Sequence, residues 1–449
     1  MSEHIYGVVE QYDFTNHVWA AVAYLDDSSV ISAKTRRLCC AQGAFEIGGV
    51  YAASLSLVCR LPGMTRYGIR GARITLRRWF DGEALTGADA PIEGIFWVVD
   101  AKKTADIFTL SGQDAMGWAD VSSYNSDGSE FGMTGGIYGF GEFLAALYPV
   151  GATLEWWMEK CVELANVLAR RQTGILPDML TWRNYDETAN GGINYCNKYV
   201  FVTDDTEDRN QPTICYLYTA DGVYKDDNPR DFLRWLAQAA GGFITVTKDG
   251  FLTLRQFVQP SLGDAVVEMA DMELEGCEVA DFRLQLYHTG VVFDDVQPSA
   301  VGGGAPDSGE LVPYRICAEG NPFLNGFAQR DPYGTNPAWH SLVWGLAMSM
   351  YHYGDLETPP RHCIARPFRV AVHTTQRYEL GQRIEFPDWH DLDETQTHDL
   401  FSVITGVEWT FRGGTVLSCG GEDSRVMADC VRATKADKAV RELRSRFKA

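Results

Sequence analysis

The sequence lacks the short motifs that mark the common enzyme classes. Its 449 residues contain no GxSxG nucleophile elbow, no GxxxxGK[ST] phosphate loop, no HExxH zinc motif and no GxGxxG after a predicted strand. The eleven cysteines form no CxxC pair, and only Cys39 and Cys40 are adjacent, so neither a disulfide framework nor a zinc knuckle is indicated. We therefore expect reduced cysteines that fill cores, and no catalytic residue, metal site or cofactor.

Long apolar runs and an excess of basic residues are also missing. The amino terminus, MSEHIYGVVEQYDF, has no basic segment followed by an apolar one, and runs such as Trp19 to Leu25 fall far short of the roughly 20 residues that span a bilayer. We expect no secretion signal and no membrane span. The net charge of −21 argues against nonspecific nucleic-acid binding by the body of the protein.

The chain instead has ordinary globular composition and strong β-strand patterns at both ends. Runs of β-branched and aromatic residues separated by Gly, Asp and Pro predict strands in the first hundred or so residues: VWAAVAYL, GGVYAASLSLVCRL, ARITLRRWF, GIFWVVDAKK and DIFTLSGQD. Later strands are predicted in CEVADFRLQLYHTGVVFDD, FRVAVHTT, QRIEFPD and LFSVITGVEWTFRGG. Helices are predicted over Thr153 to Arg171 and over Trp339 to Tyr353, where apolar residues recur every three or four positions.

The clearest local signal is DFLRWLAQAAGGFITVTKDGFLTLRQF, from Asp231 to Phe257. It predicts a capped helix, a glycine break and a hairpin with a tight turn. A phosphate loop places its glycines before a helix, whereas these follow one, so the glycines indicate a structural junction. The residues of this predicted helix-hairpin junction are Asn228, Pro229, Asp231, Gly241, Gly242, Asp249 and Gly250.

A weak internal echo indicates duplication of one β-barrel, although strand-rich sequences produce such echoes by chance. FEIGG, FWVV and DIFTLSGQD occur in that order near the amino terminus, and YELGQ, FSVI and TVLSCGGED occur in the same order near the carboxy terminus. We expect a mainly β protein with α insertions (α+β): a first barrel at 1–122, a helical and mixed domain at 123–241, a second barrel at 242–425 with a helical insertion at about 320–360, and a basic helix at 426–449. The boundary near Gly241 stays open, since the hairpin suits either neighbour.

The last segment departs from the acidic character of the body. From Val431 to the end it has seven Lys or Arg against two acids. Val440, Leu443 and Phe447 recur at helical spacing, and this stripe suits a trimer contact, docking onto another protein, or packing on its own barrel.

The Asp231 to Phe257 unit resembles the helix, glycine break and hairpin of tail-hub proteins of tailed bacteriophages and related contractile injection systems. FSVITGVEWTFRGGTVLSCGGED resembles the last barrel hairpin of that family, and NPFLNG, from Asn321 to Gly326, is similar to its segment before a helix. The resemblance implies two tail-tube-like β-barrels in one chain. A homotrimer would present six barrels and adapt the sixfold tail tube to a threefold tip.

The resemblance also implies location and partners. We expect a structural, non-enzymatic baseplate hub in the virion tail tip, assembled in the host bacterial cytoplasm. Its partners would be distal tail and tube proteins, the tape measure protein, and spike or fibre proteins, and genomic DNA would pass through without specific binding. An acidic channel would repel that DNA.

Two alternatives stay open at this point. Twelve tryptophans and sixty acids suit a carbohydrate-active enzyme or a receptor-binding module of the tail tip, in which aromatic rings stack on sugars. The acids between His390 and His398 offer hard oxygen ligands or acid-base pairs, although a charged loop is the simpler interpretation. The other alternative is the spike hub of a secretion or contractile injection machine.

Overall fold

The computed structural model describes residues 2–40, 45–120, 154–183, 229–239, 242–255, 257, 262–268, 271–279, 282–289, 310–317, 366–390 and 397–420. Within them the chain forms eighteen strands and three α-helices, so the prediction of a mainly β protein with α insertions is confirmed. The predicted helix at Trp339 to Tyr353, NPFLNG, and the carboxy-terminal stripe of Val440, Leu443 and Phe447 lie outside the described residues.

The amino-terminal part is almost entirely strand. Alternating buried and exposed residues in β4 and β7 place apolar side chains inside and Ser or Thr outside, as expected for a sheet with one solvated face. Its elements are β1 Glu3–Asp13, β2 Val18–Leu25, β3 Val30–Leu38, β4 Ser54–Arg60, α1 Arg66–Ile69, β5 Arg73–Phe80, η1 Gly87–Asp89, β6 Ile92–Thr104, β7 Ile107–Gln113 and η2 Ala115–Asp120.

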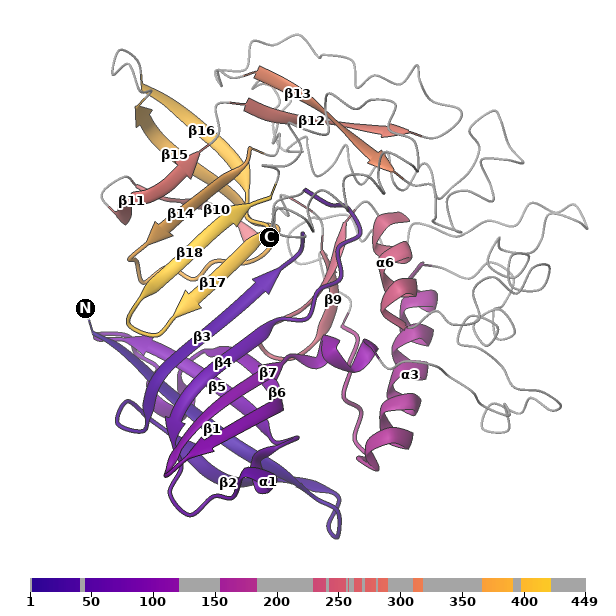
Figure 1. Cartoon of the computed structure of the whole chain (residues 1–449). Helices are drawn as coiled ribbons and strands as arrows, with labels where there is room; N and C mark the ends of the chain where they lie inside the picture. The colour runs from indigo at the N-terminus through magenta and orange to yellow at the C-terminus, as the bar shows by residue number, and fades with distance from the viewer. Residues whose placement is uncertain are drawn as a thin grey trace, which may run out of the picture.

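Two helices and a hairpin make up the described middle of the chain. They are α3 Leu154–Thr173, α6 Pro229–Ala239, β8 Phe243–Val246 and β9 Leu252–Arg255. Trp157 and Leu164 of α3 are buried in the same core as Phe232 and Leu236 of α6, and the two helices contact one another (Figure 1). The apolar faces predicted for both helices are therefore the faces that they bury.

The carboxy-terminal part returns to strands. They are β10 Asp264–Val266, β11 Met272–Val279, β12 Phe282–Thr289, β13 Glu310–Cys317, β14 Phe368–Val372, β15 Arg383–His390, β16 Thr397–Val403, β17 Gly406–Thr410 and β18 Gly414–Cys419. β12 and β13 pair with each other in parallel, and β8 and β9 form a separate two-stranded sheet.

One sheet of eleven strands joins the two ends of the chain. Its order is β11-β14-β18-β17-β3-β4-β7-β6-β5-β1-β2, and Figure 1 shows the carboxy-terminal strands continuing into the amino-terminal ones at β17 and β3. In the described part of the chain no sheet closes into a barrel, so the two closed barrels are not confirmed. β2 and β3 are separated by only the turn at 26–29, yet no ladder joins them, so the sheet stays open there.

Five strands of the amino-terminal half have counterparts of the same chain order and pairing in the carboxy-terminal half. In the first unit β3 pairs with β4, β4 with β7, β7 with β6, and β6 with β5. In the second, β11 pairs with β14, β14 with β18, β18 with β17, and β16 with β15. Every one of these pairs is antiparallel. The long strand β6 therefore corresponds to β16 and β17 together.

Equivalent hydrogen bonds place the two units in register. Gly71 N donates to Val98 O at 2.9 Å, and Gly381 N donates to Ile404 O at 2.8 Å. In both places the residue after the glycine accepts the return bond, at 2.8 Å and 2.9 Å. The glycines have φ of 79° and 81°, a left-handed conformation that side chains disfavour. Counting from Val98 and Ile404, Thr104 at the end of β6 corresponds to Thr410 at the end of β17.

The register decides which parts of the sequence echo are structural. FWVV lies in β6 and FSVI spans the end of β16, which are equivalent strands, but the register aligns Phe401 with Ile95, one residue before Phe96. DIFTLSGQD and TVLSCGGED contain the equivalent strands β7 and β18. FEIGG and YELGQ are not equivalent, because FEIGG precedes β4 whereas YELGQ precedes β15.

Candidate functional site: the joint between the two strand units

The two units meet where β17 pairs with β3. The ladder runs antiparallel from Gly406 opposite Leu38 to Thr410 opposite Lys34. Backbone and side chains are close at its first position, since a Cβ added to Gly406 would lie 2.5 Å from Ser418 Oγ and 3.0 Å from Leu38 Cδ2. Glycine therefore allows the close approach of three neighbouring strands here.

Charged side chains flank the solvent side of this joint. Glu408 of β17 contacts two cations of β3, with Oε1 2.7 Å from Lys34 Nζ and Oε2 3.9 Å from Arg36 Nε. The Lys34 side chain is 48% exposed, so this is a surface interaction of modest strength. Its acid lies on the second unit and its bases lie on the first.

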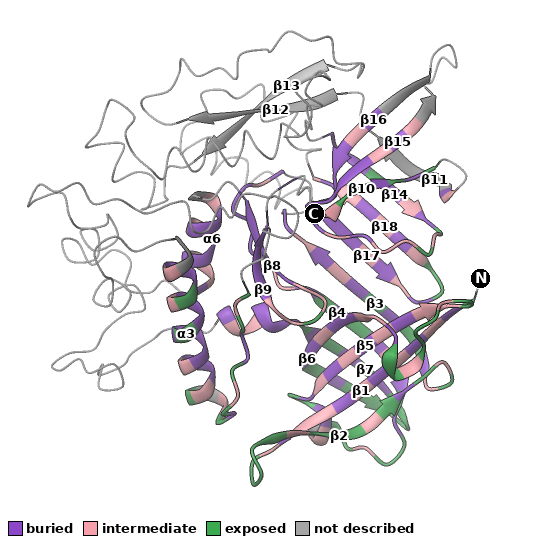
Figure 2. Cartoon of the chain, turned by 180° about the vertical axis from the view of Figure 1, so that it is seen from behind, coloured by how far each residue is buried: buried purple, intermediate pink, exposed green. Residues whose placement is uncertain are grey.

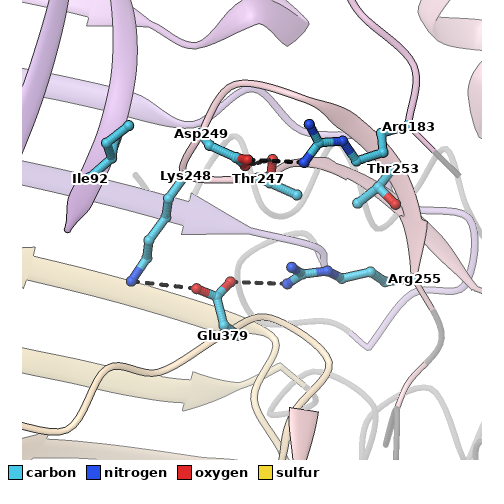
Figure 3. Close-up of a pocket in the computed structure, with 8 residues that line it drawn as sticks. All are labelled: Ile92, Arg183, Thr247, Lys248, Asp249, Thr253, Arg255 and Glu379. Atoms are coloured by element: carbon cyan, nitrogen blue, oxygen red, sulfur yellow. Dashed lines mark hydrogen bonds and ion pairs between the residues drawn. The ribbon is translucent and has the colours of Figure 1, made fainter. Parts of the chain in front are cut away.

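A buried network lies on the inner side of the same joint and is centred on Glu379 (Figure 3). Glu379 Oε2 is 3.2 Å from Arg37 Nη1 of β3. The same carboxylate contacts two side chains drawn in Figure 3, since Oε2 is 3.0 Å from Arg255 Nη1 of β9 and Oε1 is 3.5 Å from Lys248 Nζ in the hairpin turn. The Arg37 and Arg255 side chains are each only 6% exposed. One carboxylate thus ties together the first unit, the hairpin and the loop before β15.

The network continues through the amino-terminal strands. Lys248 Nζ also lies 3.7 Å from Glu93 Oε2 of β6, which is 2.8 Å from Arg78 Nε of β5. Arg78 Nη1 lies 3.4 Å from Glu3 Oε1, and that same oxygen accepts a hydrogen bond from Trp409 Nε1 of β17 at 2.7 Å. Charge-assisted contacts therefore connect β5 and β6 of the first unit, through Glu3 of β1, with β17 of the second unit.

These surroundings shift the pKa values of the charged groups. Burial raises the pKa of Glu379, but Arg37, Lys248 and Arg255 outweigh it and hold that pKa well below its usual range. Burial likewise opposes the charged form of Glu93, yet Lys248 and Arg78 lower its pKa overall. The pKa of Lys248 is lowered by burial, against the attraction of Glu93. The carboxylates are therefore ionised at neutral pH, and each depends on partners from another part of the chain.

A cavity of about 380 Å³ opens beside this network. Its lining comes from β6, β9, the hairpin turn and the segments that hold Arg183 and Glu379, and Figure 3 shows these side chains: Ile92, Arg183, Thr247, Lys248, Asp249, Thr253, Arg255 and Glu379. Each of its charged side chains is paired, with Arg183 on Asp249 and both Lys248 and Arg255 on Glu379. The charged side chains at this cavity therefore link separate segments of the chain.

The predicted helix-hairpin junction lies next to this site. α6 begins at Pro229, and Asp231 lies in its first turn. Gly242 N donates to Ala237 O at 3.0 Å, which is the bond expected when glycines end a helix. Asn228 and Gly241 lie outside the described residues.

The hairpin turn attaches to two other parts of the chain. Asp249 Oδ2 accepts from Arg183 Nη1 at 3.2 Å. Gly250 has φ of 91°, and a Cβ added to it would lie 3.2 Å from Ile95 Cδ1 of β6. The hairpin backbone also contacts the first unit directly, since Ile244 N donates to Gly49 O at 3.0 Å.

Sequence reasoning missed the residues at the centre of the site. Arg37 lies at an inward position of β3, a strand that was not predicted, and Glu379 lies in a loop. Arg255 alternates with Leu252 and Leu254 in the predicted hairpin, a pattern that places it on the polar side, but all four residues of β9 are buried. The sequence offered one signal, which is the charged residue Arg37 at a position that alternation along β3 places inside.

The glycan alternative finds no support in the described residues. Every tryptophan whose burial the structure describes is buried or half-buried, so none forms an exposed stacking platform. His390 and His398 lie on the adjacent strands β15 and β16, but the acids between them lie outside the described residues.

A metal site and a membrane-spanning helix each place requirements on the described part of the chain. It contains no group of three or more His, Cys, Asp or Glu residues that could hold a metal ion. None of its helices combines the length and the apolar character needed to cross a bilayer. The cysteines described there are free and buried, as expected for core residues.

No protein-family model and no curated protein matches this chain. Solved structures of phage tail proteins match it over almost its whole length. A tail protein from Neisseria meningitidis is 11% identical with a TM-score of 0.43, and the match covers 94% of this chain and 98% of that one. The 43 kDa tail protein of prophage MuSo2 from Shewanella oneidensis is 11% identical with a TM-score of 0.40, at the same coverage. The phage P2 baseplate in its activated conformation is 9% identical with a TM-score of 0.29, over 92% of this chain and 98% of that one. A TM-score below 0.5 carries no conclusion about what this chain does.

Proposed function

We propose that this protein is the structural hub of a bacteriophage tail tip, in which a ring of three chains closes the tail tube. The observation that carries the proposal is the pair of registered strand units joined edge to edge in one chain. A ring of three such chains contains six equivalent units, so it can match a sixfold tube on one side and a threefold tip on the other. Each unit, with its flanking strands, is the counterpart of one tail-tube barrel.

The joint supports a mechanical role. A hub transmits load between the tube and the tip, so the angle between its two units has to be fixed. The Glu379 network fixes it with contacts from β3, β9 and the hairpin turn at 3.0 to 3.5 Å. A buried charge is costly without its partners, so the two units and the hairpin are held in one arrangement. The resemblance of the Asp231 to Phe257 unit to tail-hub proteins agrees with this role.

The large sheet contains the row of strands β11-β14-β18-β17-β3-β4-β7-β6, and the solvent face of this row is the proposed lining of the channel. It is rich in small hydroxyl side chains, including Ser54 and Ser56 of β4 and Thr109 and Ser111 of β7. Its exposed or half-buried charged residues are Lys34, Arg36, Arg60, Lys102 and Arg369 against Asp100 and Glu408. The described part of this face is therefore basic, and the acidic channel expected from the net charge is not supported if this face lines the channel.

The remaining partners follow from this proposal. The ring would contact distal tail and tube proteins and the tape measure protein on one side, and spike or fibre proteins on the other. DNA would pass without specific binding, and the protein would reside in the virion tail tip after assembly in the host bacterial cytoplasm. The proposed role is structural and assigns no enzymatic activity to this chain.

Native mass spectrometry of the purified full chain tests the proposal. The expected species contains three chains of 50.0 kDa each, stable at micromolar concentration. A monomer at every concentration, in the presence of its tube protein as well as alone, would overturn the hub assignment.

A further inference from the structure

The cavity beside the Glu379 network has an exposed rim and a buried floor (Figure 3). Arg183 and Asp249 lie at the rim, where their side chains are 56% and 48% exposed. Lys248 and Arg255 lie at the floor, where the exposed fractions of their side chains fall to 13% and 6%. A small molecule that enters from solvent can therefore reach two cations that are largely withdrawn from water.

The charged groups around this cavity leave one positive charge without a counter-charge when Lys248 is protonated. In the described part of the chain three cations line the cavity against two carboxylates, and the buried groups behind it add two of each sign. The lining groups are Arg183, Lys248 and Arg255 against Asp249 and Glu379, and the groups behind are Arg37 and Arg78 against Glu3 and Glu93. The cavity is thus locally positive in a chain whose net charge is −21, and such a site attracts anions.

Lys248 keeps N–H donors that its ion pairs do not use. Its Nζ is 3.5 Å from Glu379 Oε1 and 3.7 Å from Glu93 Oε2. Both distances exceed the roughly 2.7 to 3.2 Å of a normal N–H···O hydrogen bond. Because an ammonium group carries three donors, Lys248 can donate a shorter bond to an anion in the cavity.

Arg255 and Thr253 add donors from one strand. They are two residues apart in β9 and so lie on the same face of it. Arg255 Nη1 donates to Glu379 Oε2 at 3.0 Å, but its Nε has no hydrogen-bond partner among the residues that the structure describes. The Thr253 hydroxyl is 3.5 Å from the carbonyl oxygen of Leu254, which is a weak contact. A guanidinium, an ammonium and a hydroxyl group together are typical donors to phosphate, sulfate and carboxylate.

We propose that this cavity binds a small molecule through an oxyanion group, which Lys248, Arg255 and Thr253 hold at the floor. The cavity volume of about 380 Å³ lies in the range of small-molecule sites, so it accommodates the oxyanion together with a body of several further atoms. Glu379 opposes an anion here, but three cations already surround its carboxylate. The inference goes beyond the proposed function and does not rest on it.

A bound oxyanion would stabilise the joint between the two units. Its contacts would come from β9 and the hairpin turn, beside the loop that holds Glu379 and the start of β6 at Ile92. A ligand that binds the folded chain and not the unfolded one adds stability as its concentration rises above its dissociation constant. Hydrogen exchange in the hairpin should therefore slow when the site is occupied.

Two probes separate a free oxyanion from one attached to a larger body. Inorganic sulfate supplies the group alone, and glucose 6-phosphate supplies an oxyanion on a sugar. Each is titrated into the purified full chain at constant ionic strength, which sodium chloride maintains, and hydrogen exchange is followed in peptides from β8 and β9. A saturable slowing of exchange by either probe is the expected result. Tighter binding of glucose 6-phosphate would assign a ligand with a body, and equal binding would assign a free oxyanion.

Substitutions at the floor locate the site. Lys248→Met should weaken sulfate binding at least about tenfold, because it removes a charged donor. Thr253→Val keeps the β-branched shape and every charge, and should weaken binding severalfold even if Lys248→Met disturbs the hairpin. Lys160→Met on α3 is the matched control, since this lysine also pairs with a glutamate but lies outside the cavity, and it should bind sulfate as the wild type does.

Two results would overturn the assignment. One is the absence of any saturable effect of both probes beyond that of chloride. The other is unchanged affinity in both Lys248→Met and Thr253→Val. Neither result bears on the hub assignment, because the oxyanion site requires no ring of chains.

Discussion

Replacing Glu379 by glutamine should loosen the joint between the two units. The substitution keeps the size of the side chain but removes the charge that faces Arg37, Arg255 and Lys248 at 3.2, 3.0 and 3.5 Å. Removing one partner of a buried ion pair costs about 3–5 kcal/mol. The Glu379 side chain is 24% exposed, so we expect the lower end, about 3 kcal/mol.

The matched control is Glu408→Gln on the solvent side of the same joint. It removes the contacts to Lys34 and Arg36, and a surface pair of this kind contributes about 0–1 kcal/mol. The assay is hydrogen exchange followed by mass spectrometry on peptides from β3 and β17. Exchange should accelerate about a hundredfold in Glu379→Gln and severalfold at most in Glu408→Gln. Equal acceleration in the two variants would refute the reasoning.

The stability difference between wild type and Glu379→Gln should also depend on pH. The pKa of Glu379 is depressed, so its contribution to stability is present above its usual pKa and is lost as pH falls through the depressed value. The difference between wild type and Glu379→Gln should therefore be complete at pH 6, begin to shrink as the pH falls through the usual pKa of a glutamate, and still be large at pH 4. A difference that disappears between pH 6 and pH 5 would contradict the assigned pKa shift.

Three further predictions concern single residues outside the joint. Burial raises the pKa of Asp114 to about 7, so ionisation of this carboxyl costs stability as the pH rises. Asp114→Asn should therefore stabilise η2 by up to about 4 kcal/mol at pH 8 and by much less at pH 5, measured by hydrogen exchange. Equal effects at both pH values would contradict this. Hydrogen bonds to Asp27 and Asp81 raise the pKa of His4, so the contribution of His4 to stability is present below its ordinary pKa and is lost as the pH rises through the raised value. Urea unfolding should show that His4→Gln is less stable than wild type by at most about 1 kcal/mol at pH 5.5 and equally stable at pH 9. Gly71 has φ of 79° with no atom within 4 Å of an added Cβ, so Gly71→Ala should cost about 1–2 kcal/mol through backbone strain alone, and no change in exchange of β5 and β6 would argue against it.

Local signals in the sequence predicted the elements whose patterns are self-contained. β2 spans the predicted run VWAAVAYL, and α6 begins at Pro229, where the missing N–H and fixed φ of proline suit the first helical position. The hairpin of β8 and β9 follows from alternation around a turn that contains Gly250. Each of these elements depends on contacts within about a dozen residues, so a short window of sequence suffices.

The joint was not predictable from such windows. β3, VISAKTRRL, reads as polar because its inward positions include Thr35 and Arg37. Thr35 lies opposite Trp409 and Arg37 pairs with Glu379, and both partners are far away in the chain. β17 and β3 lie at opposite ends of the sequence, so no periodicity links them. The echo of FWVV in FSVI indicated duplication, but only the bonds at Gly71 and Gly381 placed the two units in register.

The most direct measurement of the central claim is a cryo-EM reconstruction of the assembled chain. The account predicts a threefold ring with six equivalent strand units. A ring with a different number of chains, or a chain that stays monomeric, would contradict it.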